Sequence, residues 1–208
     1  MESGLTFTPE WEKPVGAVLD HYGAEDVTII GVSLGGELCM RAAAMEPRIR
    51  RVVSWSVLPS IYGALMADKP AEIRAKLEHW LDENNREAIL DLYAGLAERE
   101  PLFRWSIQHS NYAYGTSDVY EYLQKARAFT MEPVAEQITQ DVLLLSARED
   151  LLVDFGLYKQ EIDLLKNTRS LEFAVPGRAL NGQAHCNMGN TKYMLDLILN
   201  WNDRMLGQ

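Results

Sequence analysis

Three residues that lie far apart in the sequence could together perform nucleophilic chemistry: Ser33, Asp150 and His185. A serine hydroxyl attacks a carbonyl carbon efficiently only when a base within hydrogen-bond reach removes its proton, and a carboxylate commonly orients that base. Histidine is the usual base because its ordinary pKa lies near neutrality. These residue types are the set that such chemistry needs, provided that the fold brings them to one place.

Ser33 lies in a Gly31-x-Ser33-x-Gly35 pattern between a β-branched run and an alanine-rich run. Residues Val27–Val32 are typical of a buried parallel strand, and residues 35–45 are typical of a helix. A strand that turns directly into a helix strains the turn residue and projects its side chain from the sheet. We expect Gly31 and Gly35 to be required because a Cβ at either position would collide with its surroundings.

The same turn places Ser33 at the start of a helix. The backbone N–H of Leu34 is then free to bind a developing oxyanion, with help from the helix dipole. The alternative is a glycine-rich connection around a structural serine, because so short a pattern also arises by chance.

The composition is that of an ordinary globular protein with one sizeable core. The chain has 208 residues, of which 47 % are hydrophobic and 24 % are charged. Its net charge of −10 argues against nucleic acid as a partner, since that partner needs a basic face. No secretion signal, membrane-spanning run, disulfide framework or zinc spacing is recognisable. We expect a cytoplasmic protein that needs no metal or cofactor and binds neither a membrane nor nucleic acid.

Strands and helices alternate on both sides of a long helical stretch. A first helix is expected from Thr8 and Pro9 to Gly23, with one apolar face. After the strand and helix around Ser33, three further strands are expected at residues 51–58, 142–146 and 170–175. Helices are expected at residues 155–166 and 191–205. This order predicts a doubly wound parallel α/β sheet.

Residues 59–137 contain helical patterns and almost no β-branched run. We interpret them as an α-helical insertion into a core formed by residues 1–58 and 138–208. A polar, aromatic segment of this insertion offers three candidate pocket residues: His109, Tyr112 and Tyr114. The alternative is that the aromatic side chains of the insertion pack its own core.

The functional loops of an open parallel sheet gather at the carboxyl ends of its strands. Asp150 comes directly after one predicted strand, and His185 lies in the glycine-rich loop after the next. Glu149 and Asp154 are rival acids, and Asp150 could instead cap a helix. The other histidines lie on the first helix or in the insertion: His21, His79 and His109.

These segments together resemble the α/β-hydrolase superfamily. The matching pieces are residues 31–36, 142–153 and 182–187, in the chain order serine, acid, histidine. The insertion and residues 46–53 are similar to bacterial hydrolases of the dipeptidyl-aminopeptidase-like, fermentation–respiration-switch-like and pseudooxynicotine-hydrolase-like groups. The resemblance implies an α/β fold: a partial α/β-hydrolase parallel sheet with a helical cap insertion.

The resemblance also implies roles for individual residues. Ser33 would be the nucleophile, His185 the base and Asp150 the acid, and Leu34 would supply one oxyanion N–H. The expected function is a serine hydrolase that forms an acyl-enzyme with a small-molecule carbonyl substrate, by default a carboxylic ester. Peptide, amide, thioester and carbon–carbon hydrolysis use the same constellation and stay open. Another alternative is a catalytically impaired chain that acts as a binding or interaction module.

The sequence departs from the family before the serine. The 32 residues that precede Ser33 supply one helix and one strand, without the early loop that normally gives a second oxyanion N–H. The strand Val27–Val32 would then lie at a sheet edge with unpaired backbone groups. We expect either a partial version of a longer hydrolase or an edge covered by a second copy, as a homodimer, or by another chain.

Overall fold

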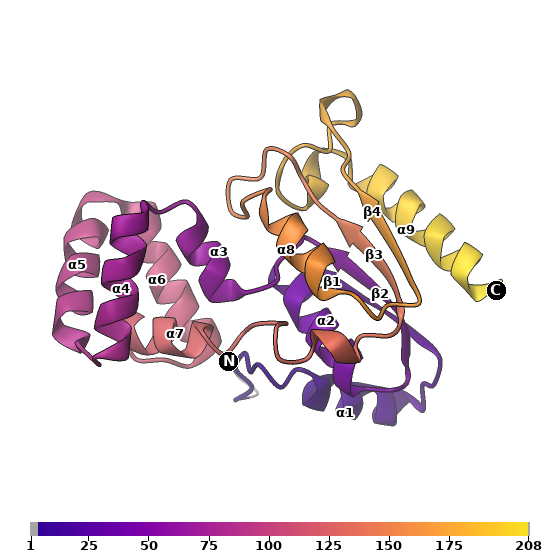
Figure 1. The fold of residues 1–208 in the computed structure, drawn as a ribbon, viewed down its shortest axis with the longest axis horizontal. Helices are drawn as coiled ribbons and strands as arrows, with labels where there is room; N and C mark the ends of the chain where they lie inside the picture. The colour runs from indigo at the N-terminus through magenta and orange to yellow at the C-terminus, as the bar shows by residue number, and fades with distance from the viewer. Residues whose placement is uncertain (1–3, 208) are drawn as a thin grey trace. The chain divides into compact units, whose positions relative to one another are not determined.

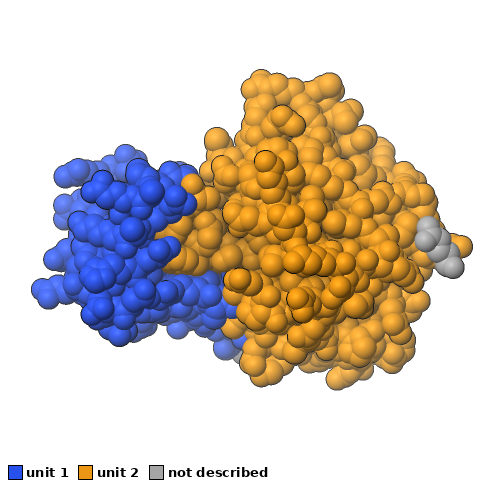
Figure 2. All heavy atoms as spheres, viewed as in Figure 1, with its two compact units in different colours: residues 1–8, 68–129 blue, residues 9–67, 130–208 orange. Residues whose placement is uncertain are grey.

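The computed structural model describes residues 4–207. They form two compact units, shown in blue and orange in Figure 2. The helical unit consists of residues 4–8 and 68–129, and the sheet unit consists of residues 9–67 and 130–207. Residues 59–67 and 130–137, which we expected in the insertion, cluster with the sheet.

A four-stranded parallel sheet with the strand order β1-β2-β3-β4 lies at the centre of the sheet unit (Figure 1). Because the order follows the sequence, each parallel pair requires a crossover connection. The predicted strands 27–32, 142–146 and 170–175 are confirmed to within one residue, whereas the strand predicted at 51–58 begins two residues earlier and ends three residues earlier. The strands are β1 (Val27–Val32), β2 (Ile49–Trp55), β3 (Asp141–Leu145) and β4 (Ser170–Ala174).

Helices cover both faces of this sheet. Neighbouring strand residues point to opposite cores, so Val52 packs in one cluster and Val53 in the other. One cluster includes side chains of α1 (Glu12–Tyr22), α2 (Leu34–Met45) and α8 (Leu157–Leu164). The other is closed by α9 (Thr191–Leu206). The doubly wound α/β architecture is therefore confirmed.

The first helix differs in detail from its prediction. It begins at Glu12 with Trp11 at the N-cap position, so Thr8 is not its cap. Gly23 ends it as predicted, with φ 59° in the left-handed region. Tyr22, the last residue of the helix, is 77 % exposed, because only Leu19 and the start of the helix reach the core.

The helical unit has its own core of leucine, isoleucine and aromatic side chains. Leu77 and Ile89 are fully buried there, and an aromatic cluster surrounds Tyr114. Its helices are α4 (Ala71–Asp82), α5 (Arg86–Arg99), α6 (Pro101–Tyr114) and α7 (Val119–Ala126). The sheet unit additionally contains α3 (Ile61–Ala67) and the short 3₁₀ helices η1 (Ala135–Gln137), η2 (Arg178–Leu180) and η3 (His185–Asn190).

Strand β1 is an edge strand of the sheet, as the strand count predicted. Ile30 and Val32 on this strand are exposed apolar side chains. Among residues 4–207, no helix combines the length and the apolar character that crossing a membrane requires.

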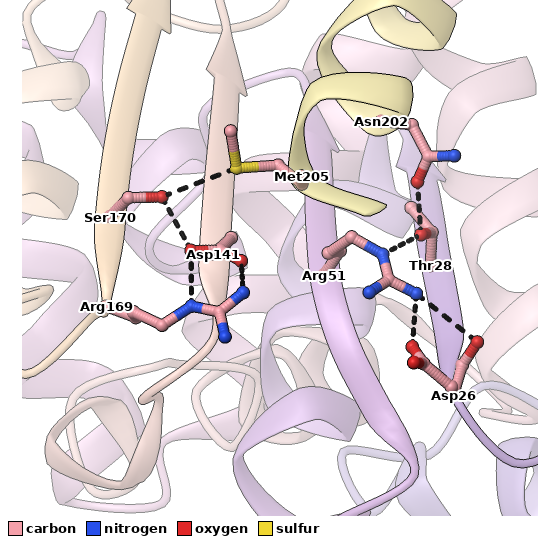
Figure 3. Close-up of polar contacts among 8 residues, drawn as sticks. All are labelled: Asp26, Thr28, Arg51, Asp141, Arg169, Ser170, Asn202 and Met205. Carbon is pink, nitrogen blue, oxygen red and sulfur yellow. Dashed lines mark hydrogen bonds and ion pairs between the residues drawn. The ribbon is translucent and has the colours of Figure 1, made fainter. Parts of the chain in front are cut away.

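Ion pairs that each contain one buried partner lie at the amino ends of the strands (Figure 3). Arg51 on β2 binds Asp26 and Thr28, and Thr28 in turn bonds Asn202 on α9. Arg51 is also the register partner of Asp141 on β3. Asp141 is paired with Arg169 and accepts a 2.7 Å hydrogen bond from Ser170 Oγ on β4. Removal of the exposed partner, Asp26 or Arg169, would leave a buried charge uncompensated, so these pairs disfavour a shifted strand register.

Two further buried carboxyl groups lie on the helices of one sheet face. Glu37 on α2 and Glu161 on α8 are both fully buried. Burial raises the pKa of Glu37 to about 8, with Arg41 opposing the shift. Burial also raises the pKa of Glu161 to about 8; Leu58 and Ser54 oppose this, and the charge of Glu37 adds to it. Both groups therefore keep their protons at neutral pH in the folded protein.

This protonation predicts a protein that loses stability as pH rises from about 4.5 to about 8. In that window the unfolded chain releases protons that the folded chain retains, so the unfolding free energy should fall on the order of 1 kcal/mol per pH unit. Glu37→Gln and Glu161→Gln should each flatten this dependence in urea unfolding at a series of pH values. Glu136→Gln, at an exposed position, is the matched control. Unchanged slopes in both buried variants would show that these groups are ionised in the folded state.

Candidate active site

Ser33, His185 and Asp150 form one continuous hydrogen-bonded chain in the sheet unit. Ser33 Oγ lies 2.9 Å from His185 Nε2, and His185 Nδ1 lies 2.7 Å from Asp150 Oδ2. An ionised carboxylate only accepts hydrogen bonds, so in the neutral imidazole the proton is on Nδ1. Nε2 is then left with a lone pair that faces the Ser33 hydroxyl.

The turn that carries Ser33 is strained. Ser33 has φ 57° and ψ −122°, outside the regions that residues with a side chain usually adopt. Its N–H donates to Trp55 O at 3.0 Å, which ties the turn to the end of β2. Leu34 is the first residue of α2, so its N–H has no acceptor within the helix. The backbone therefore presents a hydroxyl and a free amide at the same turn.

Close contacts explain one of the two glycines of the motif but not the other. A Cβ on Gly31 would lie 1.8 Å from the carbonyl oxygen of Gly35, so this position must be glycine. A Cβ on Gly35 would meet nothing within 4 Å, so the prediction that Gly35 is required on steric grounds was wrong. The second sterically required glycine is Gly36, where a Cβ would lie 2.3 Å from Ser56 O.

Asp150 serves two purposes at the end of β3. Its Oδ1 accepts hydrogen bonds from the N–H groups of Leu152 at 2.8 Å and Val153 at 3.1 Å, while Oδ2 faces His185. Burial alone would raise the pKa of Asp150, but the hydrogen bonds from His185, Leu152 and Val153 outweigh it and lower that pKa. The carboxylate is therefore ionised and fixed in orientation.

The rival acids have other partners. Glu149 forms a two-pronged ion pair with Arg178, with both N···O distances 2.6 Å, and its N–H donates to Gln183 O. Asp154 accepts a hydrogen bond from the N–H of Gly156 just before α8. Glu149 thus fastens the Asp150 loop to the His185 loop without contacting the imidazole.

The environment of His185 makes its imidazole a stronger base. Hydrogen bonds to Asp150 and then to Cys186 raise the pKa of His185 above its ordinary value of 6.5, and burial opposes them only in part.

Two neighbours that the sequence did not single out, Trp55 and Asn187, are buried and hydrogen-bonded to each other beside this loop. An asparagine two residues after the candidate histidine was the signal available in the sequence.

The three candidate pocket residues lie on α6 in the helical unit. Tyr114 is buried against Phe7, Tyr122 and Phe129 in the aromatic core of that unit, as the alternative interpretation of the insertion expected. His109 stacks on Trp105 with ring centroids 5.1 Å apart. Tyr112 is exposed. For all three residues the pocket role stays a prediction.

The fold and the site define a protein of the parallel α/β class with a serine at a strained strand-to-helix turn. A sequence model described as the alpha/beta hydrolase fold matches residues 9–178. The chain belongs to the alpha/beta hydrolase fold family.

Similar proteins agree with this assignment. The hydrolase LUC6 of a Fusarium species is 28 % identical over 139 residues, which cover 62 % of this chain and 32 % of that protein. The chain spans about a third of the length of the curated relatives it matches. Among solved structures, 2,6-dihydroxy-pseudo-oxynicotine hydrolase has a TM-score of 0.59 and 18 % identity, covering 87 % of this chain and 42 % of its own. The α/β hydrolase GrgF of a Penicillium species has a TM-score of 0.61 and 14 % identity, covering 93 % and 70 %. At these identities the structures show the shared fold.

The glycine contacts predict opposite effects of the same substitution. Gly31→Ala should lower the unfolding free energy severely or prevent folding, because its Cβ would meet backbone that cannot move away. Gly35→Ala should leave stability unchanged or raise it by up to about 1 kcal/mol, since alanine is the better helix former. Thermal unfolding of the two variants checks this. Equal stability of both would contradict the contact at Gly31.

The pairing of His185 with Asp150 predicts a shifted histidine titration. In side-chain NMR the His185 midpoint should lie above 6.5, and Asp150→Asn should lower it, because the amide removes the negative charge beside Nδ1. Asparagine keeps an oxygen for the Leu152 and Val153 N–H groups. Glu149→Gln, which removes the neighbouring charge, should leave the midpoint in place. A larger shift in Glu149→Gln than in Asp150→Asn would assign the pairing to the wrong acid.

Proposed function

We propose that this chain carries the catalytic centre of a serine hydrolase that works through a covalent acyl-enzyme. The single observation that supports this most is the hydrogen-bonded chain from Ser33 Oγ through His185 to Asp150, built on a strained turn. A structural serine would not need an unfavourable backbone conformation that aims its hydroxyl at an imidazole. Membership of the alpha/beta hydrolase fold family and the hydrolase names of the relatives support the same class of activity.

The geometry supports a two-stage mechanism. His185 Nε2 takes the proton from Ser33 Oγ while Oγ bonds to the substrate carbonyl carbon, and the Leu34 N–H stabilises the resulting oxyanion. The tetrahedral intermediate collapses, and the leaving group departs with the proton from His185. A water molecule then attacks the acyl carbon, with His185 again taking the proton. When this second intermediate collapses, His185 returns the proton to Ser33 Oγ and the acid is released. Asp150 stabilises the imidazolium in both stages without taking its proton.

The proposed substrates are small molecules with a carboxylic ester bond. Ester cleavage demands the least of this site, because an alkoxide leaving group needs only the proton that His185 already holds. Amide and carbon–carbon cleavage proceed through the same nucleophile, but they place a poorer leaving group at that step. The test panel should include 2,6-dihydroxy-pseudo-oxynicotine, which the name of a structural neighbour gives as its substrate.

A second candidate function is a binding module without turnover. One observation favours it: β1, which leads directly into Ser33, is an edge strand of the sheet that the structure describes. A serine at the end of a strand that is paired on one side only is harder to hold in a fixed position. Catalysis is sensitive to small displacements of the reacting atoms.

A fluorophosphonate probe separates the two candidates. The wild-type chain should become covalently labelled, with the modified peptide containing Ser33, and Ser33→Ala should not be labelled. Hydrolysis of short-chain esters should fall on the order of 10⁴-fold or more in Ser33→Ala. Ser106→Ala, at an exposed serine of α6, is the matched control and should react as the wild type does. Folded wild-type protein that resists the probe and cleaves none of the esters would favour the binding module.

A further inference from the structure

The buried amide of Asn187 connects the loop that carries His185 to the ends of two strands. Its Oδ1 accepts a 3.1 Å hydrogen bond from Trp55 Nε1 at the end of β2. Its Nδ2 donates to Ser146 O at 3.2 Å, directly after β3, and to Gly182 O at 2.5 Å within the loop. One side chain therefore joins three segments that are distant in the sequence.

Trp55 is hydrogen-bonded both to Ser33 and to Asn187, through different groups. Its backbone oxygen accepts the N–H of Ser33 at 3.0 Å, and its indole N–H donates to Asn187. Trp55 and Asn187 are both buried, so water does not compete for the bond between them. The serine turn and the histidine loop are thus held by one residue of β2.

The backbone after His185 does not favour this arrangement by itself. Cys186 and Asn187 both have φ 50°, in the left-handed region that is unfavourable for residues with a Cβ. Two consecutive residues in this region persist only when surrounding contacts over-determine the turn. The side-chain hydrogen bonds of Asn187 are contacts of that kind.

We propose that Asn187, held by Trp55, is a positioning residue that keeps His185 Nε2 at hydrogen-bond distance from Ser33 Oγ. The inference rests on the proposed function, because it assigns a role in that reaction. Asn187 acts through the loop and not on the reacting atoms. A residue that merely stabilised the fold would leave the placement of the imidazole unchanged, whereas a positioning residue sets its distance to both Ser33 and Asp150.

Two variants remove the connection from its two sides. Trp55→Phe deletes the indole N–H, and Asn187→Gly deletes the amide while tolerating the positive φ. Both should lower kcat for ester hydrolysis and the rate of fluorophosphonate labelling on the order of 10- to 100-fold, with KM changed little. Both should also move the His185 titration midpoint, measured by NMR, toward the ordinary value of 6.5.

Trp201→Phe is the matched control. Trp201 on α9 is equally buried, and its Nε1 has no hydrogen-bond partner in the part of the chain that the structure describes. This variant should leave kcat, the labelling rate and the His185 midpoint at their wild-type values, whatever it does to stability.

The proposal is overturned if Trp55→Phe and Asn187→Gly remain folded and keep the wild-type His185 midpoint. It is also overturned if Trp201→Phe moves that midpoint as far as they do. Because the midpoint is measured without substrate, it decides the positioning role even if the wild type proves inactive. In that case the proposed function fails, while a midpoint shifted only by the two variants still supports placement of His185 by Asn187.

Discussion

The absence of a side chain at Gly31 is the constraint on which the site depends. A Cβ there would lie 1.8 Å from the carbonyl oxygen of Gly35, so only glycine allows the chain to reverse from β1 into α2 within one residue. Gly36 imposes the same condition one turn later, because α2 passes directly over Ser56 O. These two contacts leave Ser33 with a conformation that it would not adopt alone. They are the physical reason that a serine hydroxyl and the first N–H of a helix lie in adjacent residues at this turn.

The parallel sheet then brings the other groups to that turn. The carboxyl ends of parallel strands lie on the same side of the sheet, and each of the four strands carries a residue of the site at or after that end. Ser33 follows β1, Trp55 ends β2, and Asp150 and His185 lie in the loops after β3 and β4. Non-covalent contacts between the loops complete the arrangement. They are the ion pair of Glu149 with Arg178 and the hydrogen bonds of Asn187. The strand order determines which loops are neighbours, and these contacts hold the neighbouring loops together.

The sequence predicted the parts of this site that depend on chain order. The strand ends placed Asp150 and His185 near Ser33 without any coordinates, since a parallel sheet leaves few alternatives. It could not identify Gly36 in place of Gly35, because clearance for a Cβ is decided by Ser56, a residue of another segment. It also missed Asn187, since a buried amide in a loop follows no periodicity. Tyr114 was instead assigned to a pocket because its neighbours in the sequence are polar, although its side chain packs in an aromatic core.

Two kinds of buried carboxyl group in one unit show what decides protonation here. The side chain of Asp150 is 4 % exposed and Glu37 as a whole is 0 % exposed, so both carboxyl groups lie largely out of water. Yet the pKa of Asp150 is lowered and that of Glu37 is raised to about 8. The difference lies in the donors: Asp150 accepts from two backbone N–H groups and faces an imidazole, whereas neither oxygen of Glu37 has a hydrogen-bond partner among the described residues. Burial therefore makes a carboxyl group sensitive to its partners, and the partners determine whether it is a charged acid that orients a base or a neutral group of the core.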